Sequence, residues 1–195
     1  MIARLLRHCI FISATIILSI GSCNAEENST AETKPSSIEH KLEIGRHEKL
    51  AAIKKQPHSY LADFTTDGCS GGLSAGWEFL ASKVQNMQRV HGYLPPWERC
   101  CIEHDKLYHS AGTKNTSAEE SLTLRHQADM DLKNCVLDTG KMRAPMLAEE
   151  YEISAREVEI IYAAIAELMY QAVRLGGMPC TGFSWRWGYG WPSCE

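Results

Sequence analysis

The stretch from Cys100 to Tyr108 constrains the fold more than any other part of this 195-residue chain. It contains two adjacent cysteines, a histidine, an aspartate and a tyrosine. Residues three and seven positions apart lie on one side of a helix, so Cys101, His104 and Tyr108 would face the same way. Asp105 would lie beside them. We therefore expect a helix that carries a cross-link, a base and a cation ligand on one face.

The eight cysteines call for an oxidising compartment, and the N-terminus indicates one. A short, positively charged start precedes an apolar run at residues 9–21, which is too short to span a bilayer comfortably. We predict that residues 1–25 are a signal peptide cleaved after Ala25, or a lipoprotein signal that leaves Cys23 as a lipid anchor. Either alternative predicts a secreted or extracytoplasmic protein. The six remaining cysteines predict three disulfides.

The composition changes after the predicted signal. Residues 26–58 are rich in Glu, Ser, Thr and Lys and have no sustained apolar period, so we expect a polar linker there. The folded domain is expected at residues 59–195. The formal net charge of -4 provides no basic surface, so nucleic acid is not an expected partner.

Capping and stop signals predict three main helices. They run from Trp97 to about residue 111, from Ser117 to about residue 137, and from Ser154 to about residue 176. Gly140 is expected to stop the second helix. The third is long and has one apolar stripe, which is typical of a core helix without chemistry of its own.

The C-terminal segment from Cys180 to Cys194 is rich in aromatic residues at alternating positions. Alternation predicts a short extended segment with one aromatic face, closed by a Cys180–Cys194 bridge. Two roles remain open for these rings. They either cover the long helix or form a platform at a membrane interface, where Trp and Tyr are enriched.

The first two helices can be aligned by their cysteines if they pack antiparallel. With Cys100 bridged to Cys135, His104 and Asp129 fall on the same flank of the seam and at nearly the same height. Asp131 falls on the opposite flank. The alignment therefore selects Asp129 as the partner of His104.

A His–Asp pair without a serine or cysteine nucleophile suggests that water is the nucleophile. The glycine-rich loop at residues 64–74 is either a turn held by a disulfide or a source of backbone carbonyl ligands. Together with Asp105, such carbonyls would hold a hard cation, and calcium fits oxygen ligands better than zinc. The cation would stabilise an ester oxyanion.

These residues resemble the secreted phospholipase A2 family. The active helix of that family reads Cys-Cys-x-x-His-Asp-x-Cys-Tyr, and its second helix has an Asp six residues before a cysteine. Cys100, Cys101, His104, Asp105 and Tyr108 match the first pattern, and Asp129 with Cys135 matches the second. Leu107 and Ala128 occupy both positions of one family disulfide, so the chain resembles a bacterial-like variant with a reduced disulfide set.

The patterns and the resemblance together predict a mainly α, disulfide-bonded fold. Two antiparallel helices would carry the active site, followed by a third long helix and a short Trp-rich C-terminal extended segment. The resemblance implies that His104 is the general base, that Asp129 is its partner, and that Tyr108 hydrogen-bonds Asp129.

The resemblance also implies a set of metal ligands and disulfides. The calcium ligands would be Asp105 and the backbone carbonyls of Gly68, Ser70 and Gly72, with the Asp67 side chain as a further candidate. The bridges would be Cys69–Cys101 and Cys100–Cys135. The chain departs from the family between Cys69 and Cys100, which are 31 positions apart, about twice the usual spacing.

The expected function is calcium-dependent hydrolysis of the sn-2 ester of glycerophospholipids at a membrane or micelle surface. The alternative is a non-catalytic, toxin-like or binding protein on the same scaffold. A zinc domain built from Cys and His is disfavoured by the exported context and by the disulfide-compatible seam.

Overall fold

The computed structural model of the protein describes residues 37–69 and 73–194. Within these ranges the protein is mainly helical, with six helices and no strand. The helices are α2 (Ser37–Lys54), α3 (Leu73–Lys83), α4 (Gln85–His91), α5 (Glu98–Ser110), α6 (Ala118–Tyr151) and α7 (Ala155–Gly176). The predicted signal at residues 1–25, including Cys23, lies outside the described residues. None of the described helices is long and apolar enough to cross a membrane.

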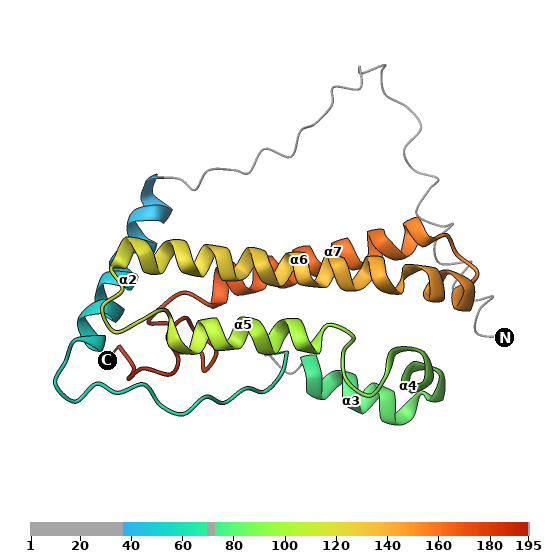
Figure 1. Ribbon diagram of the computed structural model, residues 1–195, viewed down its shortest axis with the longest axis horizontal. Helices are drawn as coiled ribbons and strands as arrows, with labels where there is room; N and C mark the ends of the chain where they lie inside the picture. The colour runs from blue at the N-terminus through green and yellow to red at the C-terminus, as the bar shows by residue number, and fades with distance from the viewer. Residues whose placement is uncertain (1–36, 70–72, 195) are drawn as a thin grey trace, which may run out of the picture. The chain divides into compact units, whose positions relative to one another are not determined.

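The longest helix, α6, packs along α7, and Figure 1 shows the two side by side. α6 continues past Gly140, where we expected it to stop, and ends at Tyr151. A β-carbon at residue 140 would come within 2.4 Å of Tyr162 on α7. Gly140 therefore allows the two helices to approach closely instead of ending one of them.

Two serine caps begin the long helices where the sequence predicts. The Ser117 side chain accepts a hydrogen bond from the backbone N–H of Glu120 at the start of α6. Ser154 and Glu157 form the full reciprocal capping box at the start of α7. These caps satisfy backbone donors that a helix N-terminus leaves unpaired.

Two clusters of buried side chains form the core. The apolar cluster consists of Cys69, Trp97, Cys100, Cys101, Leu132, Val136, Ala144, Leu147, Val158, Tyr162 and Ala166. The tail cluster consists of Leu50, Tyr108, Ala111, Ala128, Trp187 and Trp191. The first lies mainly between α5, α6 and α7, whereas the second joins α2 and the C-terminal segment to α5 and α6.

The segment expected to be a polar linker contributes a packed helix. Residues 37–54 form α2, which packs against α6, and Figure 1 shows it at one end of α6. His47, Leu50 and Lys54 are almost completely buried. Two of these three side chains are polar, and their partners lie far away in the sequence. The segment therefore lacks the apolar stripe by which a packed helix is ordinarily recognised.

The Trp-rich C-terminal segment is a series of turns and not the extended segment expected from its alternating rings. Its backbone N–H groups bond to carbonyls three residues earlier: Arg186 to Phe183, Tyr189 to Arg186, and Trp191 to Gly188. Trp187 and Trp191, four residues apart, are buried, whereas Trp185 is only partly buried. The rings therefore do not share one face with a period of two.

The C-terminal segment and α2 satisfy the last carbonyls of α5, which a helix end otherwise leaves unpaired. The donors and acceptors are Gly188 N–H to Tyr108 (2.6 Å), Gly190 N–H to His109 (3.1 Å), Trp191 Nε1 to Ser110 (2.7 Å) and Lys54 Nζ to Ala111 (2.5 Å). Both segments are thereby attached to the helix that carries Cys100–Tyr108.

Three disulfides cross-link the described residues: Cys69–Cys101, Cys100–Cys135 and Cys180–Cys194. They are the pairs expected from the sequence. The first ties the glycine-rich loop to α5, the second ties α5 to α6, and the third closes the C-terminal turns. A native disulfide typically contributes about 2–4 kcal/mol to stability.

Candidate active site

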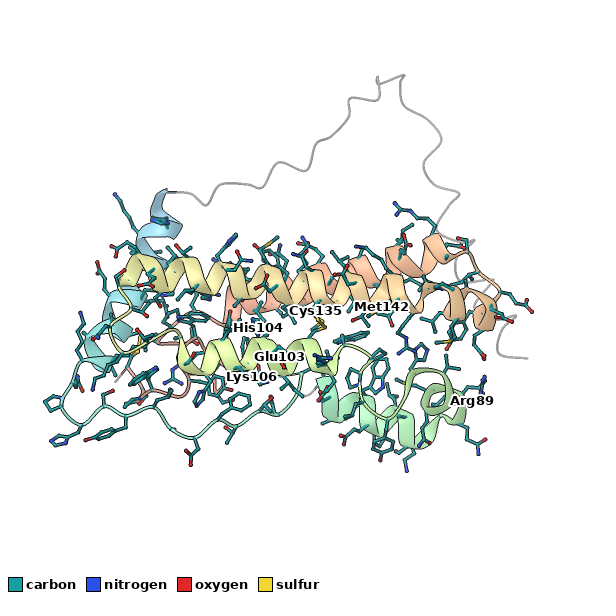
Figure 2. All side chains as sticks on the ribbon, in the orientation of Figure 1. Arg89, Glu103, His104, Lys106, Cys135 and Met142 are labelled. Atoms are coloured by element: carbon teal, nitrogen blue, oxygen red, sulfur yellow. A yellow bond between two sulfur atoms is a disulfide. The ribbon has the colours of Figure 1, made fainter. Side chains whose placement is uncertain are left out.

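His104 of α5 and Asp129 of α6 meet between the two helices. The Nε2 atom of His104 lies 3.0 Å from Oδ1 of Asp129, and both side chains are buried. Figure 2 shows His104 between α5 and α6, on the side of α5 where the disulfide of Cys135 joins the helices. Because Asp129 engages Nε2, Nδ1 is the ring nitrogen left to exchange a proton with another molecule.

Tyr108, one helical turn after His104, bonds the same carboxylate. Its hydroxyl donates to Oδ1 of Asp129 over 2.6 Å. Burial opposes ionisation of Asp129, but the hydrogen bond from His104 and the positive charge of Arg125 outweigh it and lower the pKa of this carboxyl. Asp129 is therefore a buried anion. The pKa of Tyr108 is raised by burial and by the nearby charge of Asp129, so its hydroxyl keeps its proton.

Two arginines that we did not predict from the sequence complete the surroundings of Asp129. Arg174, near the end of α7, donates from Nη1 to Oδ2 of Asp129 over 3.0 Å. Arg125 on α6 donates from Nε to the Tyr108 hydroxyl over 3.2 Å, and this nitrogen lies 3.9 Å from Oδ2. Arg125 is four residues before Asp129, a spacing that could have identified it. Nothing in the apolar stripe of α7 indicated Arg174.

Glu43 of α2 bridges both arginines. Its carboxylate accepts from Nη2 of Arg174 at 2.9 and 3.1 Å, and it also accepts from Nη1 of Arg125. Burial opposes the ionisation of Glu43, but His47 and the two guanidinium charges outweigh it and lower the pKa to about 2. The segment expected to be a linker thus supplies a charged group to the site.

An apolar cavity of about 570 Å³ opens beside this pair, and both His104 and Asp105 line it. Most of its wall comes from apolar side chains, among them Trp77, Leu132, Ile165, Leu168, Met169 and Trp185. This volume lies within the range of small-molecule binding sites. The cavity therefore combines an apolar wall with two titratable groups.

Asp105 is a buried carboxyl in surroundings that disfavour its charge. Burial raises its pKa to about 6, and the negative charges of Asp67 and Glu98 contribute to the same shift. The Thr66 hydroxyl donates to Oδ2 over 2.5 Å and only partly offsets these effects. A bound cation would stabilise the ionised form of this carboxyl.

The predicted calcium ligands fall into two groups. Asp105 and Gly68 line the same cavity, whereas Ser70 and Gly72 lie outside the described residues. Among the residues that the structure describes, no three His, Cys, Asp or Glu side chains are placed to share a metal ion. Backbone carbonyls make up most of the predicted ligand set.

No family model, curated protein or solved structure matches this chain.

Proposed function

We propose that the protein is a phospholipase A2-like enzyme that hydrolyses the sn-2 ester of glycerophospholipids in a calcium-dependent reaction. The observation that carries the proposal is the buried His104–Asp129 pair, of which His104 lines a large apolar cavity. The proposal includes a secreted or extracytoplasmic location, and a phospholipid membrane or micelle as the substrate surface.

The arrangement of α5 and α6 supports the proposal. The contacts between the two helices run in opposite sequence directions. Cys100 is joined to Cys135, whereas Tyr108, later in α5, is bonded to Arg125, earlier in α6. This order supports our proposal that α5 and α6 are the two antiparallel helices that the resemblance implies for the site. It brings His104, Tyr108 and Asp129 together as that resemblance implies.

The proposed reaction uses water as the nucleophile. His104 Nδ1 takes a proton from water as the oxygen attacks the ester carbonyl carbon. The tetrahedral intermediate then expels the glycerol oxygen, which receives that proton from His104. The products are a free fatty acid and a lysophospholipid. No serine or cysteine nucleophile is needed.

Asp129 and Tyr108 prepare His104 for this step. The ionised carboxylate accepts a hydrogen bond from the Nε2–H group, so it holds the ring in the tautomer with Nδ1 free to act as a base. It also stabilises the imidazolium that forms when Nδ1 takes its proton. The 2.6 Å hydrogen bond from Tyr108 holds the carboxylate in its place.

The apolar cavity suits the acyl chains of the substrate. Residues from α6 and α7, such as Leu132, Ile165 and Met169, would bury an acyl chain while its ester approaches His104. Each buried methylene contributes about 0.8 kcal/mol. Leu73 and Leu168 line the cavity and are also exposed, so they are suited to meet a lipid surface.

The residues at the cavity fit calcium in their chemistry. Asp105 is a buried carboxyl, and the positive charge around it is too weak to keep its pKa low. Gly68 lines the same cavity. Asp105 and the carbonyls of Gly68, Ser70 and Gly72 would hold the ion as oxygen ligands. When bound, calcium would polarise the ester carbonyl and stabilise the negative charge that develops on its oxygen.

The test is fatty-acid release by the full-length protein from mixed phospholipid micelles, with calcium and with a chelator. We expect release only with calcium, and a fall of about 10³-fold or more in kcat for His104→Gln. His126→Gln, an exposed histidine on α6, is the matched control and should retain full activity. Release that persists in His104→Gln contradicts the proposed mechanism. Binding of vesicles without any release would favour the non-catalytic alternative.

A further inference from the structure

We propose that Glu43 of α2, acting through Arg125 and Arg174, is a positioning residue for the aspartate that orients the catalytic histidine. The inference rests on the proposed function. It assigns α2 to the active site, although α2 lies in the segment whose composition predicts a linker.

The two oxygens of Asp129 have different partners. Oδ1 accepts from His104 and from Tyr108, over 3.0 and 2.6 Å. Oδ2 accepts from Arg174 over 3.0 Å, with the Arg125 Nε 3.9 Å away. Because a carboxylate group is planar, fixing Oδ2 also sets the direction in which Oδ1 meets the imidazole. Arg174 thus determines the orientation of a hydrogen bond that it does not itself make.

Glu43 keeps the two guanidinium groups together. The side chain of Arg125 is fully buried and that of Arg174 is 20% exposed, so their mutual repulsion is poorly screened. The Glu43 carboxylate contacts both of them. A buried charge left without its partner is strongly unfavourable. We therefore expect Arg174, the more exposed of the two arginines, to move away from Asp129 when Glu43 loses its charge.

The remaining charged and polar groups at this point come from the neighbouring elements. His47 of α2 places Nε2 3.9 Å from Glu43, and burial lowers its pKa, which favours the neutral ring. The backbone carbonyls of Val173 and Arg174 accept from Nη2 of Arg125, which ties that guanidinium to the end of α7. The network therefore links α2, α5, α6 and α7 around one carboxylate.

Positioning can be separated from substrate binding because Glu43, Arg125 and Arg174 do not line the cavity. Their replacement should change kcat and leave KM nearly unchanged. A displacement of about 1 Å at a catalytic group costs on the order of 100-fold in rate. We therefore expect kcat to fall about 100-fold in Arg174→Met and about 10-fold in Glu43→Gln. Arg174→Lys keeps a donor for Oδ2 and should recover part of the loss.

A double variant tests whether Glu43 acts through Arg174. If it does, Glu43→Gln should add little to the loss of kcat already caused by Arg174→Met. The matched control is Lys133→Met, which removes an ion pair of 2.8 Å to Glu167 that also joins α6 to α7 but does not touch Asp129. The control should keep the wild-type kcat. Losses of kcat that multiply in the double variant, or an equal loss in the control, would overturn the proposal.

A second measurement is independent of the enzymatic assay. The Nε2 proton of His104, bonded to a buried carboxylate, should give a low-field proton NMR signal that is absent in His104→Gln. We expect the signal to persist in Lys133→Met and to disappear or broaden in Arg174→Met, with circular dichroism confirming that both are folded. An unchanged signal in a folded Arg174→Met protein contradicts the inference. If the wild type releases no fatty acid but the signal follows this pattern, the proposed function fails and the positioning role stands.

Discussion

The apolar cluster and the tail cluster are built differently, although both bury parts of α5 and α6. The apolar cluster packs rings and aliphatic groups, such as Trp97 against Tyr162, with two disulfides beside them. The tail cluster surrounds hydrogen-bonded polar groups, and its Trp187 donates from Nε1 to Ser121 over 2.9 Å. The buried charges of Arg125 and Asp129 and the partly buried charge of Glu43 lie on this second side.

The difference shows how stability and chemistry are divided in this molecule. Apolar burial is non-directional, so the apolar cluster tolerates exchange of one side chain for another of similar size. Buried hydrogen bonds and charges need specific partners, and losing one partner leaves the other unsatisfied. The tail cluster is therefore the more sensitive of the two, and it is the one that holds the candidate active-site carboxylate.

The largest expected effect comes from Trp187. Trp187→Ala removes a ring that is 1% exposed and packs edge-on against Tyr108, and it should lower the free energy of unfolding by about 3–5 kcal/mol. Denaturant unfolding followed by circular dichroism measures it. Weaker vesicle binding without any loss of stability would instead favour a membrane-interface role for this ring.

Two conservative substitutions, one in each cluster, test the same difference. Trp187→Phe loses a paired N–H and should cost about 1–3 kcal/mol. The Nε1 atom of Trp97 is buried without a hydrogen-bond partner among the described residues, so Trp97→Phe loses ring volume but no hydrogen bond and should cost less than Trp187→Phe. Equal costs in the two variants would remove the distinction between the clusters.

The next expected effect is a loss of stability at low pH that comes from Glu43, beside the tail cluster. The pKa of Glu43 is lowered from its ordinary value of 4.5 to about 2 in the folded state, so this carboxylate stabilises the fold above pH 4.5. Its contribution, about 2–3 kcal/mol, should be lost as the pH falls from about 4.5 to about 2. Unfolding measured at several pH values should therefore show a shallower acid dependence in Glu43→Gln than in the wild type. Glu149→Gln, an exposed residue near the far end of α6, should keep the wild-type dependence.

The smallest effect concerns Asp105, beside the apolar cluster. Its pKa is raised to about 6 from 3.8, so ionisation of this carboxyl costs stability as the pH rises through this interval. Asp105→Asn should therefore stabilise the metal-free protein at pH 7.5 by roughly 1 kcal/mol, measured by thermal unfolding in chelator. Calcium should raise the unfolding temperature of the wild type but not of the variant. A variant that is less stable than the wild type in chelator would show that the carboxylate is stabilised by groups of the protein alone.

The sequence was sufficient wherever the determining interactions are local or follow a helical period. The caps at Ser117 and Ser154 act within four residues, and the shared face of Cys101, His104 and Tyr108 follows from the period of the helix. Cysteine positions and helix periodicity together also brought Asp129 to His104.

Tertiary structure decided the contacts between distant residues that neither cysteine spacing nor helix periodicity links. Glu43 forms ion pairs with two arginines only because α2 packs against α6. A polar composition cannot distinguish such a helix from a linker. In the sequence Gly140 resembles a helix stop, but in the structure it lies inside α6, against Tyr162. The C-terminal rings alternate in sequence, yet turns bury Trp187 and Trp191, because the open carbonyls at the end of α5 bind this segment. Local patterns thus determined the helices and the His–Asp pair, whereas long-range hydrogen bonds and charges determined what surrounds that pair.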